Sequence, residues 1–293
     1  MIDAGTDDGD VLTSERTRTI EWQVAGACNY DCTYCIQSKQ YRRGRPQREQ
    51  LERAIDTFAA LPGRWEIKCS GGEAFAHPLF MSYVVPALMT RTPHAISVLT
   101  NFSATRAELM EFARLTRGRL AVFSASLHLE FTTVEEFAAK AEWFVLQLDP
   151  EVRFVVNQVV LPGRERELAA CRAAIEARGL RWFPQLYKVD GGVYDYENPD
   201  ALIPLIGKKP APRDANTAPS YRGLVCWSGV DYFVVDKDGD AWACRTAKRF
   251  GEGALGNIFD GTLARLAAPS PCSYDICPCT VPANRGMIEG IAG

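Results

Sequence analysis

Three closely spaced cysteines near the start of the chain have the spacing of an iron–sulfur site. Cys28, Cys32 and Cys35 follow an apolar stretch, in the run Gly-Ala-Cys-Asn-Tyr-Asp-Cys-Thr-Tyr-Cys. Cysteine thiolates are the usual ligands of four-iron clusters, which normally have four of them. Three cysteines in one tight loop therefore predict a cluster in which one iron stays open to bind a small molecule.

A zinc knuckle and a disulfide loop are the alternative interpretations of this segment. A structural zinc site takes four ligands, usually as two pairs of Cys or His residues. No other Cys or His lies within thirty residues on either side of the three cysteines. The spacing therefore favours an iron–sulfur cluster.

Apolar, strand-like runs alternate with amphipathic segments between residues 20 and 187, and these elements must position the cysteine loop. The expected strands are Ile20–Ala25, Trp65–Ser70, Ala95–Asn101, Leu120–Ser126, Val152–Val160 and Arg181–Tyr187. The expected helices are Arg48–Leu61, Pro78–Thr90, Thr105–Leu115, Thr133–Leu146 and Arg164–Arg178. This alternation predicts an α/β fold with a parallel sheet and crossover helices, an incomplete (β/α) barrel. Active sites of parallel barrels lie at the C-terminal ends of the strands, so polar residues there are site candidates.

Length and composition narrow the class of protein. The 293 residues suffice for one large domain and a smaller one. The first eighteen residues are polar and acidic, and no apolar stretch reaches transmembrane length, so we expect a cytoplasmic protein without a membrane role. The ten cysteines then stay reduced, because disulfides are rare in the cytosol. A net charge of −3 offers no basic surface for nucleic acid. The basic run at residues 41–48 is either a solvated loop or a contact for an anionic substrate or electron donor.

The Cys-x3-Cys-x2-Cys spacing, with Tyr34 directly before the last cysteine, resembles the signature of the radical S-adenosylmethionine (radical SAM) superfamily. The resemblance implies that the methionine part of SAM binds the open iron of a [4Fe-4S] cluster. One electron from the cluster then cleaves SAM into methionine and a 5′-deoxyadenosyl radical. It further implies a partial (β/α)6 barrel, here residues 19–189, and a flavodoxin or ferredoxin-type reductant.

Strand ends supply the candidate SAM contacts. Ser70-Gly-Gly-Glu73 ends the second expected strand, where two glycines let the backbone approach a ligand closely, although the motif alone usually marks a turn. In the family, the segment at this place holds the amino group of SAM, and the next two strand ends contact its ribose and carboxylate. The resemblance therefore implies cofactor contacts from Tyr34, Gly71, Gly72, Glu73, Thr100, Asn101, Ser124 and Ser126. Serine and asparagine at strand ends can equally just satisfy turns.

Three further polar residues are candidate substrate contacts. Asn157 and Gln185 lie inside otherwise apolar strands, and His128 lies just past the end of the fourth strand. Each could instead serve an internal hydrogen-bond network, as buried polar groups commonly do.

Five more cysteines lie between residues 226 and 279. Cys226 and Cys244 flank a segment that reads as a hairpin turning at residues 237–239, which would bring these two thiols together. The acidic turn lacks the rest of an EF-hand calcium loop. Residues 190–223, rich in Pro and Gly, are the expected linker to this region, and residues 1–18 are an expected flexible N-terminus.

This C-terminal region, residues 224–293, resembles the small, cysteine-rich α+β "twitch" extension of radical SAM enzymes, a shortened relative of the SPASM domain. The extension binds one auxiliary [4Fe-4S] cluster. The resemblance implies Cys226 and Cys244 as ligands together with two of the three cysteines Cys272, Cys277 and Cys279. A zinc site is the alternative, since four thiolates also suit zinc.

Two cysteines remain outside these sets. Cys171 lies in an alanine-rich helix, where a packed, inert thiol is expected. Cys69 lies beside the two glycines, and strand alternation turns either Cys69 or Ser70, not both, toward the barrel interior. A cysteine that returns hydrogen to the opposite face of a substrate radical produces an epimer, so Cys69 is the candidate hydrogen donor.

Short twitch-bearing enzymes of this kind include epimerases and dehydrogenases of antibiotic pathways, so the resemblance implies a saccharide or aminocyclitol substrate. The spare cysteine favours an epimerase. An alcohol dehydrogenase and a ribosomal-peptide maturase are the enzymatic alternatives. A non-catalytic electron carrier is an alternative of another class, but it predicts a fourth cysteine near Cys28, which the sequence lacks.

Overall fold

The structure of the protein is a computed structural model. It describes residues 16–37, 39–189, 192–197, 199–206, 220–275, 277 and 279–290. Most of the expected flexible N-terminus and residues 207–219 of the expected linker lie outside the described residues. The division into domains stays a prediction.

Six parallel strands form the predicted partial barrel, and each lies within two residues of its predicted bounds. They are β1 (Thr19–Ala25), β2 (Glu66–Gly71), β3 (Ala95–Thr100), β4 (Leu120–Ser126), β5 (Arg153–Val160) and β6 (Trp182–Leu186). Each strand pairs in parallel with the next one along the chain. Their C-terminal ends therefore meet at one edge of the sheet, where the cysteine loop leaves β1. The predicted α/β fold class is confirmed.

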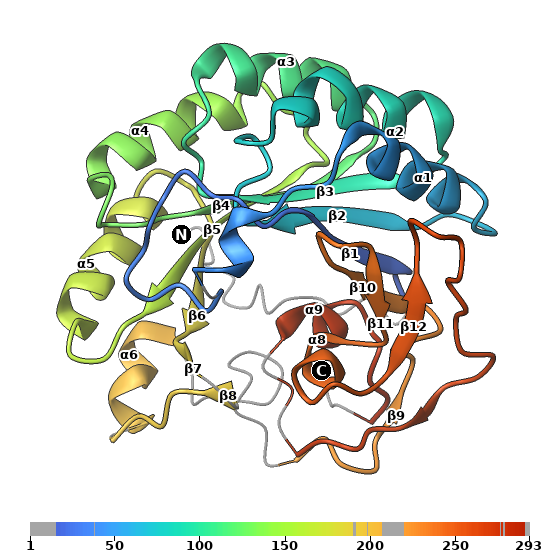
Figure 1. Cartoon of the computed structure of the whole chain (residues 1–293). Helices are drawn as coiled ribbons and strands as arrows, with labels where there is room; N and C mark the ends of the chain where they lie inside the picture. Colours follow the sequence, from blue (N-terminus) through green and yellow to red (C-terminus); the bar gives the residue numbers. More distant parts are fainter. Residues whose placement is uncertain are drawn as a thin grey trace, which may run out of the picture.

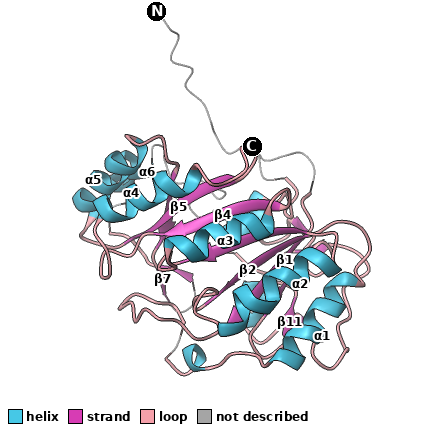
Figure 2. Ribbon diagram, turned by 90° about the horizontal axis from the view of Figure 1, so that it is seen from above, coloured by secondary structure: helices cyan, strands magenta, loops and turns pink. Residues whose placement is uncertain are grey.

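Helices cover the outer face of this sheet (Figure 1). Seen from above, they lie over the strands (Figure 2). They are α1 (Arg48–Ala59), α2 (Val85–Arg91), α3 (Arg106–Thr116), α4 (Val134–Val145) and α5 (Glu165–Glu176). Thr105 and Thr133 cap α3 and α4, and each side chain accepts a hydrogen bond from the backbone of a glutamate three residues on. No helix in the described part of the chain has both the length and the hydrophobicity needed to cross a bilayer.

The helix expected at residues 78–90 differs from the structure. A π-helical segment, η2 (Phe80–Val84), precedes the shorter α2. Pro86 stands in the first turn of α2 and has no N–H to continue the regular hydrogen-bond ladder. The wider π turn accommodates this missing bond.

The C-terminal segment extends the same sheet on its β1 side. β10 (Tyr232–Val235) pairs in parallel with β1, and β11 (Asp240–Trp242) and β12 (Ala254–Asn257) follow in antiparallel order. The predicted hairpin at residues 237–239 is confirmed, with Gly239 at a positive φ of 88°. In Figure 1 this segment, with the short helices α8 (Arg245–Arg249) and α9 (Thr280–Asn284), fills the opening of the barrel.

Shorter elements complete the described chain. These are η1 (Tyr41–Arg43), β7 (Lys188–Val189), β8 (Gly192–Val193), η3 (Pro199–Leu202), α6 (Ile203–Ile206), β9 (Val225–Cys226) and β13 (Ser270–Pro271). β7 pairs with β8, and β9 pairs with β13, both antiparallel.

Strand alternation separates the core from the barrel interior. On β2, Ile67 and Cys69 pack in the hydrophobic core, whereas Lys68 and Ser70 line an internal cavity. Successive residues of a strand point to opposite faces of the sheet, so one face packs against the helices and the other is left to form a site.

Candidate functional site

A cavity of about 380 Å³ lies inside the barrel, within the roughly 300–1,000 Å³ range of small-molecule sites. Most of the residues predicted as site candidates line it: Cys28, Cys32, Tyr34, Cys35, Gly71, Gly72, Thr100, Asn101, Ser124, Ser126, His128, Asn157, Gln185 and Cys279. The fold therefore brings the cysteine loop, several strand ends and one C-terminal cysteine to a common space.

The cysteine loop is anchored where β1 ends. The register of β1 against β2 shifts between Gln23 and Ala25, and Gly26 and Ala27 then both donate backbone hydrogen bonds to the carbonyl of Gly44. These contacts leave the three thiols along the cavity wall. Because all three face one space and none is in a disulfide, the loop fits a cluster with three protein ligands.

The two glycines after β2 let the backbone pass close to this loop. Gly71 has a φ of 132°, and an added Cβ would lie 2.1 Å from the carbonyl oxygen of Ala25. A Cβ on Gly72 would lie 2.2 Å from the oxygen of Ala27. Both glycines also line the cavity, so they seat the cysteine loop whether or not their backbone contacts a cofactor.

Glu73 does not line the cavity. Its buried carboxylate accepts hydrogen bonds from the Thr100 hydroxyl at 2.7 Å, the Asn101 backbone at 2.6 Å and the Phe75 backbone at 3.1 Å. Burial raises the pKa of Glu73 to about 7, although these bonds act in the opposite direction. The side chain ties the end of β2 to the end of β3, and a cofactor contact from Glu73 stays a prediction.

Asn101 connects this network to the cysteine loop. Its side-chain amide donates to Asn29 at 2.8 Å and lies 3.8 Å from the Cys28 sulfur. The end of β3 thus helps to orient the first thiol of the loop.

His128 faces the cysteine loop. Its Nδ1 lies 2.8 Å from the Tyr34 hydroxyl and 3.6 Å from the Cys32 sulfur. Burial lowers the pKa of His128 to about 4, so the ring is neutral near pH 7. His128 lines the cavity, and its side chain bonds to the cysteine loop, where it holds Tyr34 in place.

The remaining polar candidates lie on the inner face of the barrel. Ser124 and Ser126 on β4, Asn157 on β5 and Gln185 on β6 all line the cavity. The side-chain nitrogen of Asn157 is buried and has no hydrogen-bond partner among the described residues. A buried donor without a partner is costly, which marks Asn157 as a point where a bound molecule would bond.

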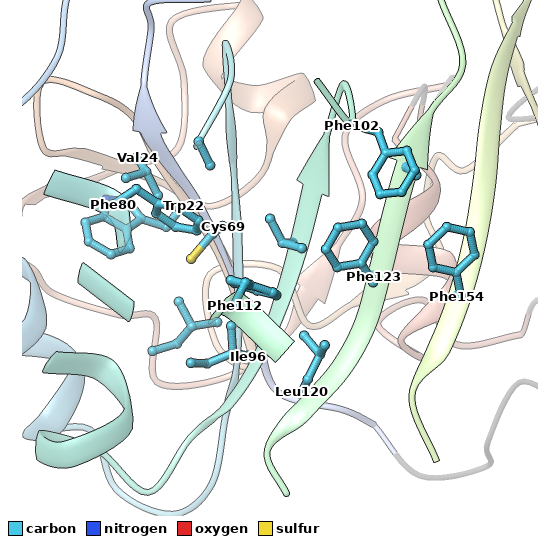
Figure 3. Packing of buried hydrophobic residues seen from close by; sticks show 14 of the residues in the cluster. Trp22, Val24, Cys69, Phe80, Ile96, Phe102, Phe112, Leu120, Phe123 and Phe154 are labelled. Atoms are coloured by element: carbon cyan, nitrogen blue, oxygen red, sulfur yellow. The ribbon is translucent and has the colours of Figure 1, made fainter. Parts of the chain in front are cut away.

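Cys69 is not in the cavity, which corrects the prediction that it faces a substrate. Figure 3 shows its side chain in the hydrophobic cluster that also holds Trp22, Phe80 and Phe112. It is fully buried, and burial raises the pKa of its thiol to about 12. Ser70, one position on, takes the inward place. Cys69 is therefore a core residue, as is Cys171 on α5.

The five C-terminal cysteines lie in a second, small hydrophobic cluster. Burial raises the pKa of Cys277, and the neighbouring thiols Cys279, Cys244 and Cys226 raise it further. Burial raises the pKa of Cys272 as well, and Cys226 raises it further. Cys226, Cys244, Cys272 and Cys277 thus lie near one another, and none of these four lines the cavity. This donor set fits one four-thiolate cluster or zinc site.

Cys279 differs from the other four because its sulfur faces the barrel. It donates a hydrogen bond to Glu21 on β1 at 3.6 Å. Glu21 is buried and also accepts from the Tyr232 hydroxyl at 2.6 Å and from Arg245 at 2.8 Å. Arg245 and Lys68 hold the pKa of Glu21 well below its usual value although burial opposes them.

The sequence analysis missed this charged group. Glu21 is an acidic residue in an apolar strand, a signal that could have found it. Arg245, which also lines the cavity, carries no such local signal, because only the docking of the C-terminal segment brings it inside, and Lys188 lines the cavity directly after β6.

No group of three or more Cys, His, Asp or Glu side chains within the described residues is close enough to hold a single metal ion. In a four-iron cluster each thiolate binds a different iron, so the thiolates stand farther apart than the ligands of one ion. The first cysteine set fits a cluster with three protein ligands, and the C-terminal set fits a four-thiolate cluster or a zinc site.

Comparison with known proteins places the fold. No protein-family model matches the chain, and no similar sequence is found among the curated proteins. Among solved structures, Streptococcus suis SuiB bound to precursor peptide SuiA aligns with a TM-score of 0.60 and 13% identity, over 85% of this chain and 64% of SuiB. The anSMEcpe structure with bound AdoMet aligns with a TM-score of 0.57 and 16% identity, over 84% of this chain and 78% of anSMEcpe. BtrN in complex with AdoMet and 2-DOIA aligns with a TM-score of 0.50 and 16% identity, over 84% of this chain and 80% of BtrN. At such identities the likeness shows a shared fold alone, the partial (β/α) barrel described above.

Proposed function

We propose that the protein is a radical SAM enzyme acting on a small molecule. The observation that carries this proposal is the placement of Cys28, Cys32 and Cys35 on the wall of a cavity inside a partial barrel. When bound there, a [4Fe-4S] cluster and SAM supply a 5′-deoxyadenosyl radical that removes hydrogen from an unactivated carbon. Solved structures of the same fold with bound AdoMet support the proposal.

The inner strand ends would hold SAM beside the loop. Asn101 lies next to Cys28, Thr100 precedes it on the cavity wall, and Ser124 and Ser126 continue this wall toward Asn157. Asn157, with its unbonded buried nitrogen, would meet the substrate or the SAM carboxylate. The chain thus excludes water on the core side and presents hydrogen-bonding groups on the cavity side.

We assign the auxiliary cluster to Cys226, Cys244, Cys272 and Cys277, which leaves Cys279 as a free thiol. Cys279 replaces Cys69 as the candidate hydrogen donor, because it alone of the C-terminal cysteines lines the cavity in the described part of the chain. In an epimerisation its S–H bond breaks and a C–H bond forms on the opposite face of the substrate radical. The thiyl radical left behind takes one electron from a flavodoxin or ferredoxin-type reductant and one proton from solvent.

The test uses anaerobically reconstituted protein with SAM and dithionite. The wild-type chain should form 5′-deoxyadenosine, and Cys28→Ala should form none, because a cluster with two thiolates is lost. A reconstituted wild-type protein that binds iron but cleaves no SAM would be an electron carrier instead. Wild-type cleavage by Cys28→Ala with an intact cluster would overturn the assignment.

The kind of reaction is decided with candidate saccharides in deuterated buffer. A product one mass unit heavier supports an epimerase whose donor is an exchangeable thiol, and Cys279→Ala should cleave SAM without giving that product. A product two mass units lighter would show a dehydrogenase. Turnover only with a peptide would show a maturase, the class suggested by the peptide-bound SuiB structure.

A further inference from the structure

Basic side chains dominate the charged lining of the cavity. Two acidic residues within the described chain line it, and both are already paired: Glu21 with Arg245 at 2.8 Å and Lys68 at 3.6 Å, and Glu66 with Arg285 at 2.8 Å. Three further basic residues line it as well, namely Arg153, Lys188 and Arg249. The acidic groups therefore do not balance the basic ones.

Lys188 is the most informative of these residues. It lies on β7, directly after β6, and its half-buried side chain lines the cavity. Its electrostatic neighbours are Cys279, Arg245, Glu21 and Arg249. Burial and the two arginines lower the pKa of this ammonium group, whereas Cys279 and Glu21 act in the opposite direction. Glu21, the carboxylate among these neighbours, is already paired with Arg245 and Lys68, so an anionic group that enters the cavity would find the Lys188 ammonium as a partner.

The position of Lys188 separates it from the expected cofactor contacts. Those contacts gather around Cys28 and the ends of β2 to β4, whereas Lys188 faces Cys279 and Glu21. Arg249 at the exposed end of α8 adds a second positive charge on the same side of the cavity. This end is where a substrate within reach of the Cys279 thiol would place its remaining groups.

We infer that the substrate carries an anionic oxygen group, a carboxylate or a phosphate, which pairs with Lys188. This inference rests on the proposed function and narrows its substrate class from saccharides in general to acidic or phosphorylated ones. Charge-assisted hydrogen bonds between an ammonium group and such oxygens are about twice as strong as neutral ones. A polyamine such as an aminocyclitol would instead bring positive charge against Lys188 and Arg249, where like charges repel.

The test measures binding by calorimetry to anaerobically reconstituted protein saturated with SAM, without reductant. The probes are glucuronate, glucose 6-phosphate, glucose and 2-deoxystreptamine. At least one of the two anionic probes should bind at least tenfold more tightly than glucose, and 2-deoxystreptamine should bind most weakly. The stronger anionic probe tells whether a carboxylate or a phosphate is preferred.

Variants assign the effect to Lys188. Lys188→Met should weaken anionic binding about tenfold or more and leave glucose binding unchanged, while Lys188→Arg should keep most of the affinity. Arg117→Met is the control, because Arg117 is exposed and does not line the cavity. Iron content and circular dichroism show whether each variant is folded and loaded.

Three results would overturn the inference: no preference for either anionic probe, tighter binding of 2-deoxystreptamine, or unchanged anionic affinity in Lys188→Met. A loss of iron in Lys188→Met that Lys188→Arg prevents would show that the lysine balances cluster charge instead. SAM cleavage is measured on the same samples. Cleavage without anion preference overturns this inference alone, and anion preference without cleavage overturns the proposed function alone.

Discussion

The ion pair between Arg285 and Glu66 fastens the C-terminal segment to the barrel, and removing it should be costly. Arg285 follows α9, directly after the cysteines near residue 279, and its guanidinium donates to the Glu66 carboxylate at 2.8 Å. Only 15% of the Arg285 side chain and 4% of the Glu66 side chain are exposed. Arg285→Met leaves a buried carboxylate without this partner, which costs about 3–5 kcal/mol of unfolding free energy.

The loss of unfolding free energy in Arg285→Met should depend on pH, because the pKa of Glu66 depends on Arg285. Burial raises the pKa of Glu66, but the charge of Arg285 and hydrogen bonds from Arg285 and Ser97 outweigh it, so the pKa lies below its usual value. In the wild-type protein Glu66 therefore stabilises the fold above its unfolded-state pKa of about 4.3, and this contribution is lost as the pH falls through the lower folded-state value. In Arg285→Met, burial dominates and raises the pKa, so the variant should gain stability as the pH falls. The gap between the two proteins should be widest near pH 7 and narrow toward pH 5.

Urea unfolding of the reconstituted proteins, followed by tryptophan fluorescence at several pH values, measures this gap. Arg114→Met is the matched control, because Arg114 pairs with Glu111 at 2.7 Å but both side chains are about half or more exposed. Its cost should stay below about 1 kcal/mol. A cost below about 1 kcal/mol for Arg285→Met, or a gap that widens in acid, would refute the reasoning.

Three other predictions concern cysteines and a glycine. Cys277→Ala should halve the iron content from about eight per chain, because the variant loses a ligand of the auxiliary cluster. Cys279→Ala should keep about eight irons per chain. The reverse pattern in iron and sulfide analysis would exchange the roles of the two cysteines. Cys69→Ala should cost about 1 kcal/mol of stability, as for a buried methylene, with SAM cleavage and product unchanged, and loss of the product would return the donor role to Cys69. Gly72→Ala should reduce folded, iron-loaded protein, because its Cβ would lie 2.2 Å from the Ala27 oxygen, and normal iron loading would show that the loop can move aside.

The sequence predicted the local features of this protein well, because each depends on neighbouring residues. The apolar runs predicted the six parallel strands, and apolar residues at helical spacing predicted the helices between them. The hairpin turn at Gly239 followed from its turn residues. The spacing of Cys28, Cys32 and Cys35 likewise predicted a loop with three thiols on one wall, and all three line the cavity.

Which groups share the cavity was decided only by tertiary structure. Alternation along β2 separates Cys69 from Ser70 but does not tell which faces the helices, since both side chains are small and fit either face. The division between Cys277 and Cys279, two residues apart, also had no local signal. Glu21 meets Arg245, 224 positions away, and Cys279, 258 positions away, because β10 docks in parallel against β1. Contacts at such separations depend on how whole elements pack, and a sequence pattern that reports only on neighbours along the chain carries no record of them.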